Sequence, residues 1–195
     1  MNDFIIIIIT TILLLSVLMM YESKYSELIY VKSDVDNREY LCRNRPDKLQ
    51  AANTLANIKK KLLKIVHKLE QDYPKDKRVI HLVTKFQPRK ITESISGTKY
   101  TSYSLNKGEK IVFCIRSKDE NEKLVKLNTM MFVAIHELAH VMTISIGHTT
   151  EFWDNMKFIL KCAIKHRIYK RQDFRKKPVS YCGTTITDSP LEDDE

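Results

Sequence analysis

The chain lacks the closely spaced cysteine pairs of a zinc ribbon. Its 195 residues contain four cysteines and no Cys-x-x-Cys motif, which argues against a structural zinc ribbon. Internal repeats are also absent, and the only low-complexity tract is a run of isoleucines near the start. These absences exclude a repeat architecture, and the length behind the isoleucine run predicts one ordinary domain with a real core.

The four cysteines leave the disulfide pattern open. Cys114 falls in a predicted strand and Cys162 in a predicted helix, which suits buried free thiols in a reducing compartment. Cys42 and Cys182 offer one candidate bridge, but an even number of cysteines does not by itself establish a disulfide.

The run from Phe4 to Tyr21 is apolar, interrupted only by Thr and Ser. Roughly 18 residues at 1.5 Å each reach about 27 Å, the lower end of bilayer hydrocarbon thickness. A cleaved signal peptide is the alternative. The run has no basic segment before it, carries Asp3 there instead, and has no small-x-small cleavage site after it, which favours an uncleaved transmembrane anchor over residues 1–21.

The basic residues around this anchor predict its orientation. No Lys or Arg precedes the apolar run, whereas Lys24, Lys32, Arg38, Arg43 and Arg45 follow it. The positive-inside rule therefore places the rest of the chain on the cytosolic side of the membrane.

Residues 136–140 read His-Glu-Leu-Ala-His, an H-E-x-x-H motif. Residues four apart share one face of a helix, so His136 and His140 can each offer an imidazole nitrogen to one Zn²⁺ ion at about 2.0–2.1 Å. Glu137 then lies beside the metal, where its carboxylate can take a proton from water that zinc has made acidic. The motif therefore predicts hydrolysis with Glu137 as general base.

The residues around the motif argue against a chance match. With six His in the chain, an H-E-x-x-H string arises by composition alone in about one chain in a hundred. Residues 130–135 and, apart from His140, 138–142 are apolar, so this helix is predicted to be largely buried. Unpaired polar groups there cost roughly 1–3 kcal/mol each. One metal ion satisfies all three polar side chains, which favours a zinc site over a structural His pair.

A catalytic zinc site needs a third protein ligand and one open position. We expect this ligand to be His148, because Gly147 suits the left-handed end of a helix and would turn the chain back toward the metal. Glu151 is the alternative ligand. A carboxylate at that position is more typical of the first turn of the next helix.

The sequence from His136 to His140, then seven residues, His148 and Phe152-Trp153 resembles the WLM and SprT-like group of zinc metallopeptidases, which are H-E-x-x-H zincins. The resemblance is specific over about residues 130–153. It implies that His136, His140 and His148 bind zinc, that Glu137 is the general base, and that the substrates are proteins, notably proteins crosslinked to DNA.

Three stretches are similar to a membrane-anchored branch of this group that large double-stranded DNA viruses encode. They are residues 103–116, the His motif and residues 178–183. In a virion, the cytosolic side of the anchor would become the interior. The anchor departs from the soluble DNA-repair members of the group, so their substrate does not carry over directly.

The chain is basic, with a net charge of +9, and because the anchor contributes only Asp3 the remainder carries +10. Two clusters concentrate this charge and could attract nucleic-acid phosphates or anionic lipids. The first is expected to be a solvated helix face, and for the second both interpretations stay open. The clusters are Lys59, Lys60, Lys61, Lys64 and Lys68, then Lys161, Lys165, Arg167, Lys170, Arg171, Arg175, Lys176 and Lys177.

Hydrophobic periodicity predicts three helices around the motif helix. The first runs from an Asp47 cap to about Tyr73, and a short second helix ends before Pro88. The last runs from Glu151 to about Arg171.

Two strands are predicted before the motif. Residues 100–105 and 110–115 flank Asn106-Lys107-Gly108-Glu109, a turn in which Gly permits a positive φ, and together they predict a hairpin. Residues 120–127 are expected to be helical, and Asn128 or Thr129 to cap the motif helix.

These elements predict an α+β, zincin-like fold, in which helices surround a small antiparallel sheet, the zinc-binding helix is central, and one transmembrane helix precedes the domain. The family resemblance implies the same arrangement. The predicted boundaries are residues 1–21 for the anchor, 22–46 for a linker, 47–183 for the metallopeptidase domain and 184–195 for an acidic tail, expected to be disordered.

Four further residues or segments have expected roles. An edge strand of the hairpin could bind an extended peptide, or the hairpin could simply cover the core, and the sequence does not say which strand lies at the edge. Tyr181 could donate a hydrogen bond to the tetrahedral oxyanion, while Phe152 and Trp153 are expected to pack and to orient the His148 loop.

The sequence favours a membrane-anchored zinc endopeptidase acting on protein or peptide substrates. One alternative is a DNA-associated protease acting on DNA-protein crosslinks, which DNA would stimulate and salt would weaken. The other is a non-catalytic membrane or virion protein with a structural zinc site. An intact Glu137 argues against the second alternative, since a structural site needs no free carboxylate.

Overall fold

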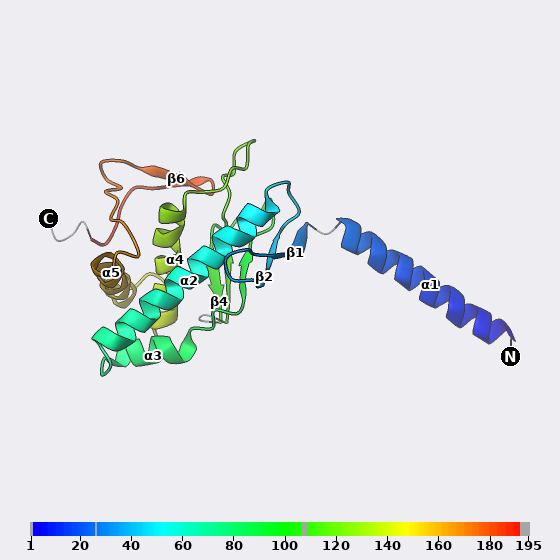
Figure 1. Cartoon of the computed structure of the whole chain (residues 1–195), viewed down its shortest axis with the longest axis horizontal. Helices are drawn as coiled ribbons and strands as arrows, with labels where there is room; N and C mark the ends of the chain where they lie inside the picture. Colours follow the sequence, from blue (N-terminus) through cyan, green and yellow to red (C-terminus); the bar gives the residue numbers. More distant parts are fainter. Residues whose placement is uncertain (1, 26, 107–108, 192–195) are drawn as a thin grey trace.

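The computed structural model describes residues 2–25, 27–106 and 109–191. Figure 1 shows helix α1 (Asn2–Tyr25) extending away from the other elements, which pack together. The predicted turn residues Lys107 and Gly108 and the end of the predicted acidic tail, residues 192–195, lie outside the described residues.

Helix α1 does not pack against the core of the domain. Its stretch Asp3–Glu22 is long and apolar enough to cross a membrane, and none of it is buried in the structure. A signal sequence near an N-terminus has the same length and composition. The structure therefore agrees with the predicted anchor in length and apolar character alone.

Among the described residues, four helices follow α1 and build the domain. They are α2 (Lys48–Asp72), α3 (Lys77–Lys85), α4 (Leu127–Met142) and α5 (Thr150–Lys165). The predicted helix from Asp47 to Tyr73 is confirmed, and so is the short one before Pro88. Helix α5 ends well before the predicted Arg171, because the backbone turns at Arg167, whose φ is 55°.

The predicted caps differ in outcome: Asp47 is the N-cap residue of α2 without a capping side chain, and the caps predicted for α4 are wrong. Asp47 stands at the start of α2, but its carboxylate makes no cap and instead accepts a hydrogen bond from Arg116 Nη1 at 2.6 Å. Helix α4 begins at Leu127, so neither Asn128 nor Thr129 caps it. The Asn128 amide donates to the Lys170 carbonyl at 2.8 Å, which holds the segment after α5 against the start of α4.

The helix predicted for residues 120–127 is also wrong. Only its last residue, Leu127, is helical, and it begins α4. Leu124 forms a β-bridge with Arg116, and the Val125 N–H donates to the Ile115 carbonyl at 2.9 Å. This segment therefore runs extended beside the residues that follow the sheet, because long-range pairing overrides its local helical preference.

The predicted hairpin exists, within a mixed sheet of three strands. Strands β3 (Ile91–Glu93), β4 (Tyr103–Leu105) and β5 (Lys110–Phe113) lie in the order β3-β5-β4. β4 pairs with β5 antiparallel, whereas β3 pairs with β5 parallel, so the prediction of a purely antiparallel sheet is wrong. β4 lies at an edge of this sheet.

Two further hairpins were not predicted. β1 (Leu28–Lys32) pairs with β2 (Glu39–Arg43), and β6 (Val179–Tyr181) pairs with β7 (Thr184–Ile186). The first hairpin lies in the segment assigned to a linker and packs against α2, and β7 lies in the segment assigned to the tail. The domain boundaries given above stay a prediction.

Cys114 and Cys182 form a disulfide, while Cys42 and Cys162 are free and buried. The predictions of a free Cys114 and of a Cys42–Cys182 bridge are therefore wrong. Cys42 lies on β2, which packs against α2 and β3, whereas Cys182 lies in the turn between β6 and β7. The pairing follows from tertiary structure, because the bonded residues are separated by 68 positions.

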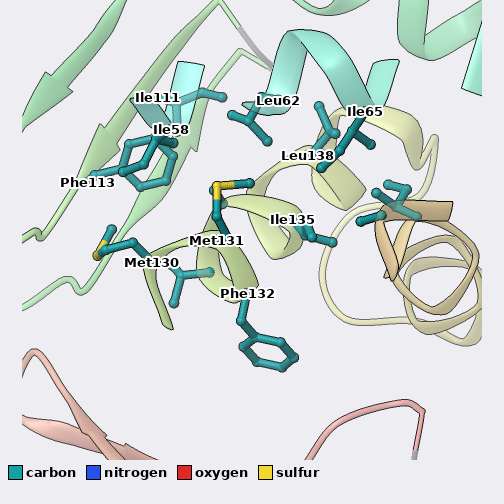
Figure 2. Packing of buried hydrophobic residues seen from close by; sticks show 14 of the residues in the cluster. Ile58, Leu62, Ile65, Ile111, Phe113, Met130, Met131, Phe132, Ile135 and Leu138 are labelled. Atoms are coloured by element: carbon teal, nitrogen blue, oxygen red, sulfur yellow. The ribbon is translucent and has the colours of Figure 1, made fainter. Parts of the chain in front are cut away.

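Helix α4 is central to the core. Figure 2 shows Met131, Ile135 and Leu138 of α4 near Leu62 and Ile65 of α2. All five side chains are at most 1% exposed. Full burial of an aliphatic side chain contributes about 1.5–3 kcal/mol, so this packing holds α4 firmly in place.

The basic cluster on α2 is only partly the solvated face that was predicted, since Lys60 and Lys64 are exposed but Lys59 and Lys61 make contacts within the domain. Lys59 is 5% exposed, and its Nζ lies 3.9 Å from Asp36 Oδ2 and over the Tyr40 ring. Lys61 donates to the Ile168 carbonyl at 3.0 Å. These two lysines therefore connect α2 to its neighbours, and the prediction is wrong for them.

Candidate metal centre

Helix α4 carries His136 and Glu137 next to each other and His140 one turn later. The predicted spacing holds, and the ring centroids of His136 and His140 lie 5.0 Å apart. Both rings are partly exposed on an otherwise buried helix, while Glu137 is 3% exposed. The core packing of α4 therefore fixes the backbone from which all three side chains project.

A loop after α4 brings the third histidine to the same place. Gly147 has a φ of 88°, but it lies within this loop and does not end α4, which already stops at Met142. The ring centroid of His148 lies 4.9 Å from those of His136 and His140. The predicted approach of His148 from a loop is thus present in the structure.

Glu151, the alternative ligand, holds this loop in place. Its carboxylate accepts hydrogen bonds from the Ile144 N–H at 3.0 Å and from the Ser145 N–H at 3.1 Å. Glu151 lies in the first turn of α5, as the sequence favoured. It supports the loop that carries His148 and is absent from the histidine cluster.

The three histidines can converge on one ion. His148 Nε2 lies 3.0 Å from His136 Nε2, and one ligand nitrogen of each of the three residues lies within 4.8 Å of the others. Tetrahedral zinc with bonds of about 2.0–2.1 Å requires nitrogens about 3.3 Å apart. Small side-chain rotations would therefore bring the three nitrogens to zinc-binding distance.

The protonation of the histidines suits a cation. Burial, together with the proximity of His140 and His148, lowers the pKa of His136 to about 3. Burial and then His148 lower the pKa of His140 to about 4. Both rings are thus neutral at physiological pH, which is the form that ligates metals.

Glu137 carries an oxygen without a partner. Its carboxylate accepts a hydrogen bond from the Ser104 backbone N–H, while within the described residues no donor reaches its Oε2 atom. Burial raises the pKa of Glu137 to about 8. A buried carboxylate oxygen of this kind calls for a partner. Water beside a bound cation would supply one, so the residues present fit a metal site.

Two aromatic side chains support the cluster. Phe152 lies under all three imidazoles, with centroid distances of 4.9 Å to His136, 4.4 Å to His140 and 4.7 Å to His148. Trp153 stacks on the His148 ring at 5.6 Å. The predicted packing role of both aromatic residues is confirmed.

The cluster opens into a cleft of about 610 Å³. Its lining includes residues 101–104, residues of α4 from Phe132 to His140, and the loop with Ile146 and His148. Because β4 lies at the sheet edge, its backbone borders the cleft directly. The strand of the predicted hairpin that lies beside the histidines is therefore β4.

Tyr181 reaches the same cleft from β6. Its hydroxyl lies 2.6 Å from Ser102 Oγ, and the side chain is 3% exposed. Burial, and then the charge of Glu137, hold the pKa of Tyr181 above its usual value, so it remains a hydrogen-bond donor at any physiological pH. The sequence singled out Tyr181 by residue type alone.

Ser102 and Ser104 also belong to the site, and the sequence did not predict a role for either residue. Ser104 supplies the backbone N–H that Glu137 accepts, and Ser102 contacts Tyr181. The predicted strand 100–105 contained both residues, but only the position of β4 at the sheet edge shows that they face the cleft.

A second group, Asp72, Cys162 and His166, also has its candidate ligand atoms close together. Asp72 Oδ2 already pairs with Lys165 Nζ at 2.8 Å and with His166 Nε2 at 2.9 Å. The ammonium group occupies the carboxylate oxygen that a metal would need, so this group is an ion-pair cluster.

Several members of the second basic cluster are paired in the same way. Besides Lys165, Lys176 Nζ lies 3.2 Å from Asp173 and Arg175 Nε lies 2.9 Å from Asp188. This pairing reduces the free positive charge near the cleft. A nucleic-acid partner stays a prediction.

Comparison with known proteins identifies the family. The model of the WLM domain matches residues 35–194. Protein R325 of Acanthamoeba polyphaga mimivirus is 34% identical over 98% of this chain and 100% of its own length. Protein 042R of Invertebrate iridescent virus 3 is 39% identical over 42% of this chain and 49% of its own length.

A solved structure is also similar. The crystal structure of Wss1 from Saccharomyces cerevisiae covers 63% of this chain and 84% of its own chain, with 17% identity and a TM-score of 0.44. The family match spans most of the chain and includes the three histidines and Glu137. The chain therefore belongs to the WLM-domain family of metalloproteases, and its relatives include viral proteins.

Proposed function

We propose that this protein is a zinc-dependent endopeptidase anchored to a membrane by α1. One observation carries the proposal: three histidines bring ligand nitrogens within 4.8 Å of one another, and they line a cleft beside an edge strand together with Glu137, whose Oε2 has no partner among the described residues. Membership of a metalloprotease family supports the same reading.

His136, His140 and His148 would hold the metal. Three histidines leave one position open, which is the pattern of catalytic zinc sites. When bound, zinc would act as a Lewis acid that polarises a carbonyl and makes water acidic near pH 7.

Glu137 would move the proton. Its unpartnered Oε2 is available to accept a proton from the attacking water, and the same group can then deliver that proton to the leaving amine. In the metal-free protein, burial raises the pKa of Glu137 to about 8, and a neighbouring cation would lower this pKa. The Ser104 N–H orients the carboxylate during both steps.

Strand β4 would hold the substrate. The Ser104 backbone is turned away from β5 and toward Glu137, so the edge of β4 faces the cleft. An extended peptide can pair with such an edge through backbone hydrogen bonds, which bind many sequences with little side-chain selectivity. Tyr181 would donate a hydrogen bond to the oxygen that gains charge in the transition state.

The membrane orientation receives two opposing signals. The basic residues after α1 favour a cytosolic domain, whereas a disulfide such as Cys114–Cys182 is typical of an oxidising compartment. We propose the cytosolic side, on the positive-inside rule. Protease protection of the domain in sealed vesicles with a known orientation would decide between the two sides.

The test uses the full chain in detergent micelles. Bound zinc and cleavage of an unfolded protein would be measured for the wild type and for Glu137→Gln, with and without DNA. We expect about one zinc per chain in both proteins and cleavage only by the wild type, since removing the base lowers the rate by about 10²–10⁴-fold.

The other outcomes each point to a different account. Zinc in both proteins without cleavage would favour a structural zinc site. Cleavage that depends on DNA would favour the crosslink-directed alternative. Absence of zinc from the wild type would overturn the proposal.

A further inference from the structure

The hairpin that carries Tyr181 has an unusual turn. Cys182 and Gly183 are its central residues, with φ angles of 47° and 77°. Turns with two left-handed residues favour Asn or Asp followed by Gly, so a cysteine at the first position is atypical. At Gly183 an added Cβ would lie 3.1 Å from Lys118 Cδ, which makes this turn tight against its neighbour.

The same hairpin has no backbone ladder to the main sheet. β6 and β7 pair only with each other, as a two-stranded sheet, within the described residues. Figure 1 shows β6 lying outside the elements that surround α4. The Cys114–Cys182 disulfide provides the covalent link between this turn and the end of β5.

The disulfide closes a ring of contacts that ends in the cleft. The Cys114 N–H donates to Ser102 Oγ at 3.1 Å, and Ser102 Oγ lies 2.6 Å from the Tyr181 hydroxyl. Tyr181 is the residue directly before Cys182, which bonds back to Cys114. Movement of the β6–β7 turn away from β5 would therefore carry the Tyr181 hydroxyl away from Ser102 and from the cleft.

We propose that the Cys114–Cys182 disulfide is a redox-sensitive positioning crosslink that holds the Tyr181 hydroxyl in the catalytic cleft, so that reducing the disulfide lowers peptidase activity. The activity part rests on the proposed function. The two cysteines act through Tyr181 and touch no reacting atom. Neither free cysteine, Cys42 or Cys162, can replace the crosslink, because neither lies in this ring of contacts.

The reduction itself is simple chemistry. A cellular dithiol breaks the S–S bond by exchange, leaves two thiols on the protein and becomes a disulfide itself. A phosphine does the same in vitro: the phosphorus takes the oxygen of one water molecule, and the two sulfurs take its protons. A phosphine is the better probe here, because dithiols also ligate zinc.

The experiment compares the zinc-loaded full chain in detergent micelles before and after phosphine treatment. Peptide mapping without reduction first establishes whether Cys114 and Cys182 are linked. Hydrogen exchange of residues 179–186 reports on the position of the hairpin without reference to activity. Cleavage kinetics then give kcat and KM, and bound zinc is measured in every sample.

We expect reduction to speed exchange in residues 179–186 and to lower kcat about tenfold or more, with KM and zinc content unchanged. Loss of a transition-state hydrogen-bond donor lowers kcat by about 10²–10³-fold. Reduction of the disulfide should therefore lower kcat by no more than Tyr181→Phe does. Tyr181→Phe should show no further fall on reduction.

Two cysteine variants serve as a matched pair. Cys114→Ala/Cys182→Ala should resemble the reduced wild type and should not respond to the phosphine. Cys42→Ala/Cys162→Ala should respond as the wild type does, since its crosslink is intact.

Three results would overturn the proposal: no Cys114–Cys182 peptide in the unreduced protein, exchange and kcat unchanged by reduction, or an equal response in Cys114→Ala/Cys182→Ala. A wild type that binds zinc but cleaves nothing would refute the proposed peptidase instead. The exchange of residues 179–186 would then decide alone whether the disulfide holds Tyr181.

Discussion

Helices α1 and α4 are both strongly apolar, and the structure treats them in opposite ways. The side chains of α1 from Phe4 to Met20 are exposed on every face, whereas most of α4 is buried, chiefly against α5, α2 and α3. Figure 1 shows the two helices far apart, one projecting from the domain and one within it. Hydrophobicity alone thus does not predict whether a helix is buried in the domain or exposed.

The polar residues within the two helices make the distinction. In α1, the hydroxyls of Thr10, Thr11 and Ser16 donate to carbonyls one turn earlier, at 2.8–3.0 Å. A helix in a bilayer must satisfy its polar groups internally in this way. In α4, the Glu137 carboxylate has an oxygen with no partner among the described residues. The three hydroxyls of α1 thus have partners within their own helix, whereas the Glu137 oxygen is open to a ligand.

The largest expected effect concerns the cluster built on α4. His148→Ala should weaken zinc binding about 1,000-fold or more, because it removes a ligand, whereas losing a residue that merely orients a ligand costs about 10–100-fold. His166→Ala is the matched control, since His166 pairs with Asp72. Competition with a chelator of known affinity measures both. Equal affinities in the two variants would remove His148 from the site.

A matched pair of leucines tests the two helices directly. Leu138→Ala should lower the free energy of unfolding of the domain by about 3 kcal/mol, because it leaves a cavity in the core. Leu14 is 61% exposed on α1, so Leu14→Ala should leave that free energy unchanged. Chemical denaturation followed by a signal from the domain measures both. A comparable loss from Leu14→Ala would mean that α1 packs on the domain.

The pH dependence of stability should reveal the histidines of α4. Their pKa values in the folded, metal-free protein are lowered to about 3 and about 4, below the unfolded value of 6.5. The unfolded chain therefore binds more protons between pH 4 and 6.5. The stabilisation is complete above pH 6.5, and on acidification it is lost by up to about 1.4 kcal/mol per pH unit for each histidine.

Glu137 has the opposite effect, since its raised pKa lowers stability as the pH rises from 4.5 toward 8. The measurement is therefore best made in a metal-free Glu137→Gln background, as denaturation at a series of pH values. Adding His136→Gln and His140→Gln should flatten the profile. A profile that keeps its slope without these two histidines would place the titrating groups elsewhere.

The smallest expected effect is at Trp153. Its ring stacks on His148 but remains 41% exposed, so Trp153→Ala should weaken zinc binding by about tenfold or less. Tyr30→Ala, at an exposed position on β1, is the control and should change nothing. A loss as large as that of His148→Ala would show that Trp153 holds the loop itself and not just the ring.

Local patterns predicted the parts of the molecule that depend on local structure. The spacing of His136 and His140 placed both on one turn of a buried helix, and the periodicity before Tyr73 predicted α2. The approach of His148 followed from its distance in sequence and the loop around Gly147, although α4 ends earlier than predicted.

What the sequence did not predict depends on contacts between distant residues. The parallel pairing of β3 with β5, the hydrogen bond from Ser104 to Glu137, and the Cys114–Cys182 disulfide all join segments that carry no mutual signal in one sequence. Lys59 shows the same limit, since its burial depends on Asp36 in the β1–β2 loop.

The central claim is that three histidines hold one zinc ion and leave one position open. X-ray absorption at the zinc edge of the full chain, loaded with one equivalent of zinc, tests it most directly. We expect four light-atom neighbours at about 2.0–2.1 Å, with the multiple scattering of three imidazoles, and two imidazoles in His148→Ala. Sulfur neighbours at about 2.3 Å, or an unchanged spectrum in His148→Ala, would contradict it.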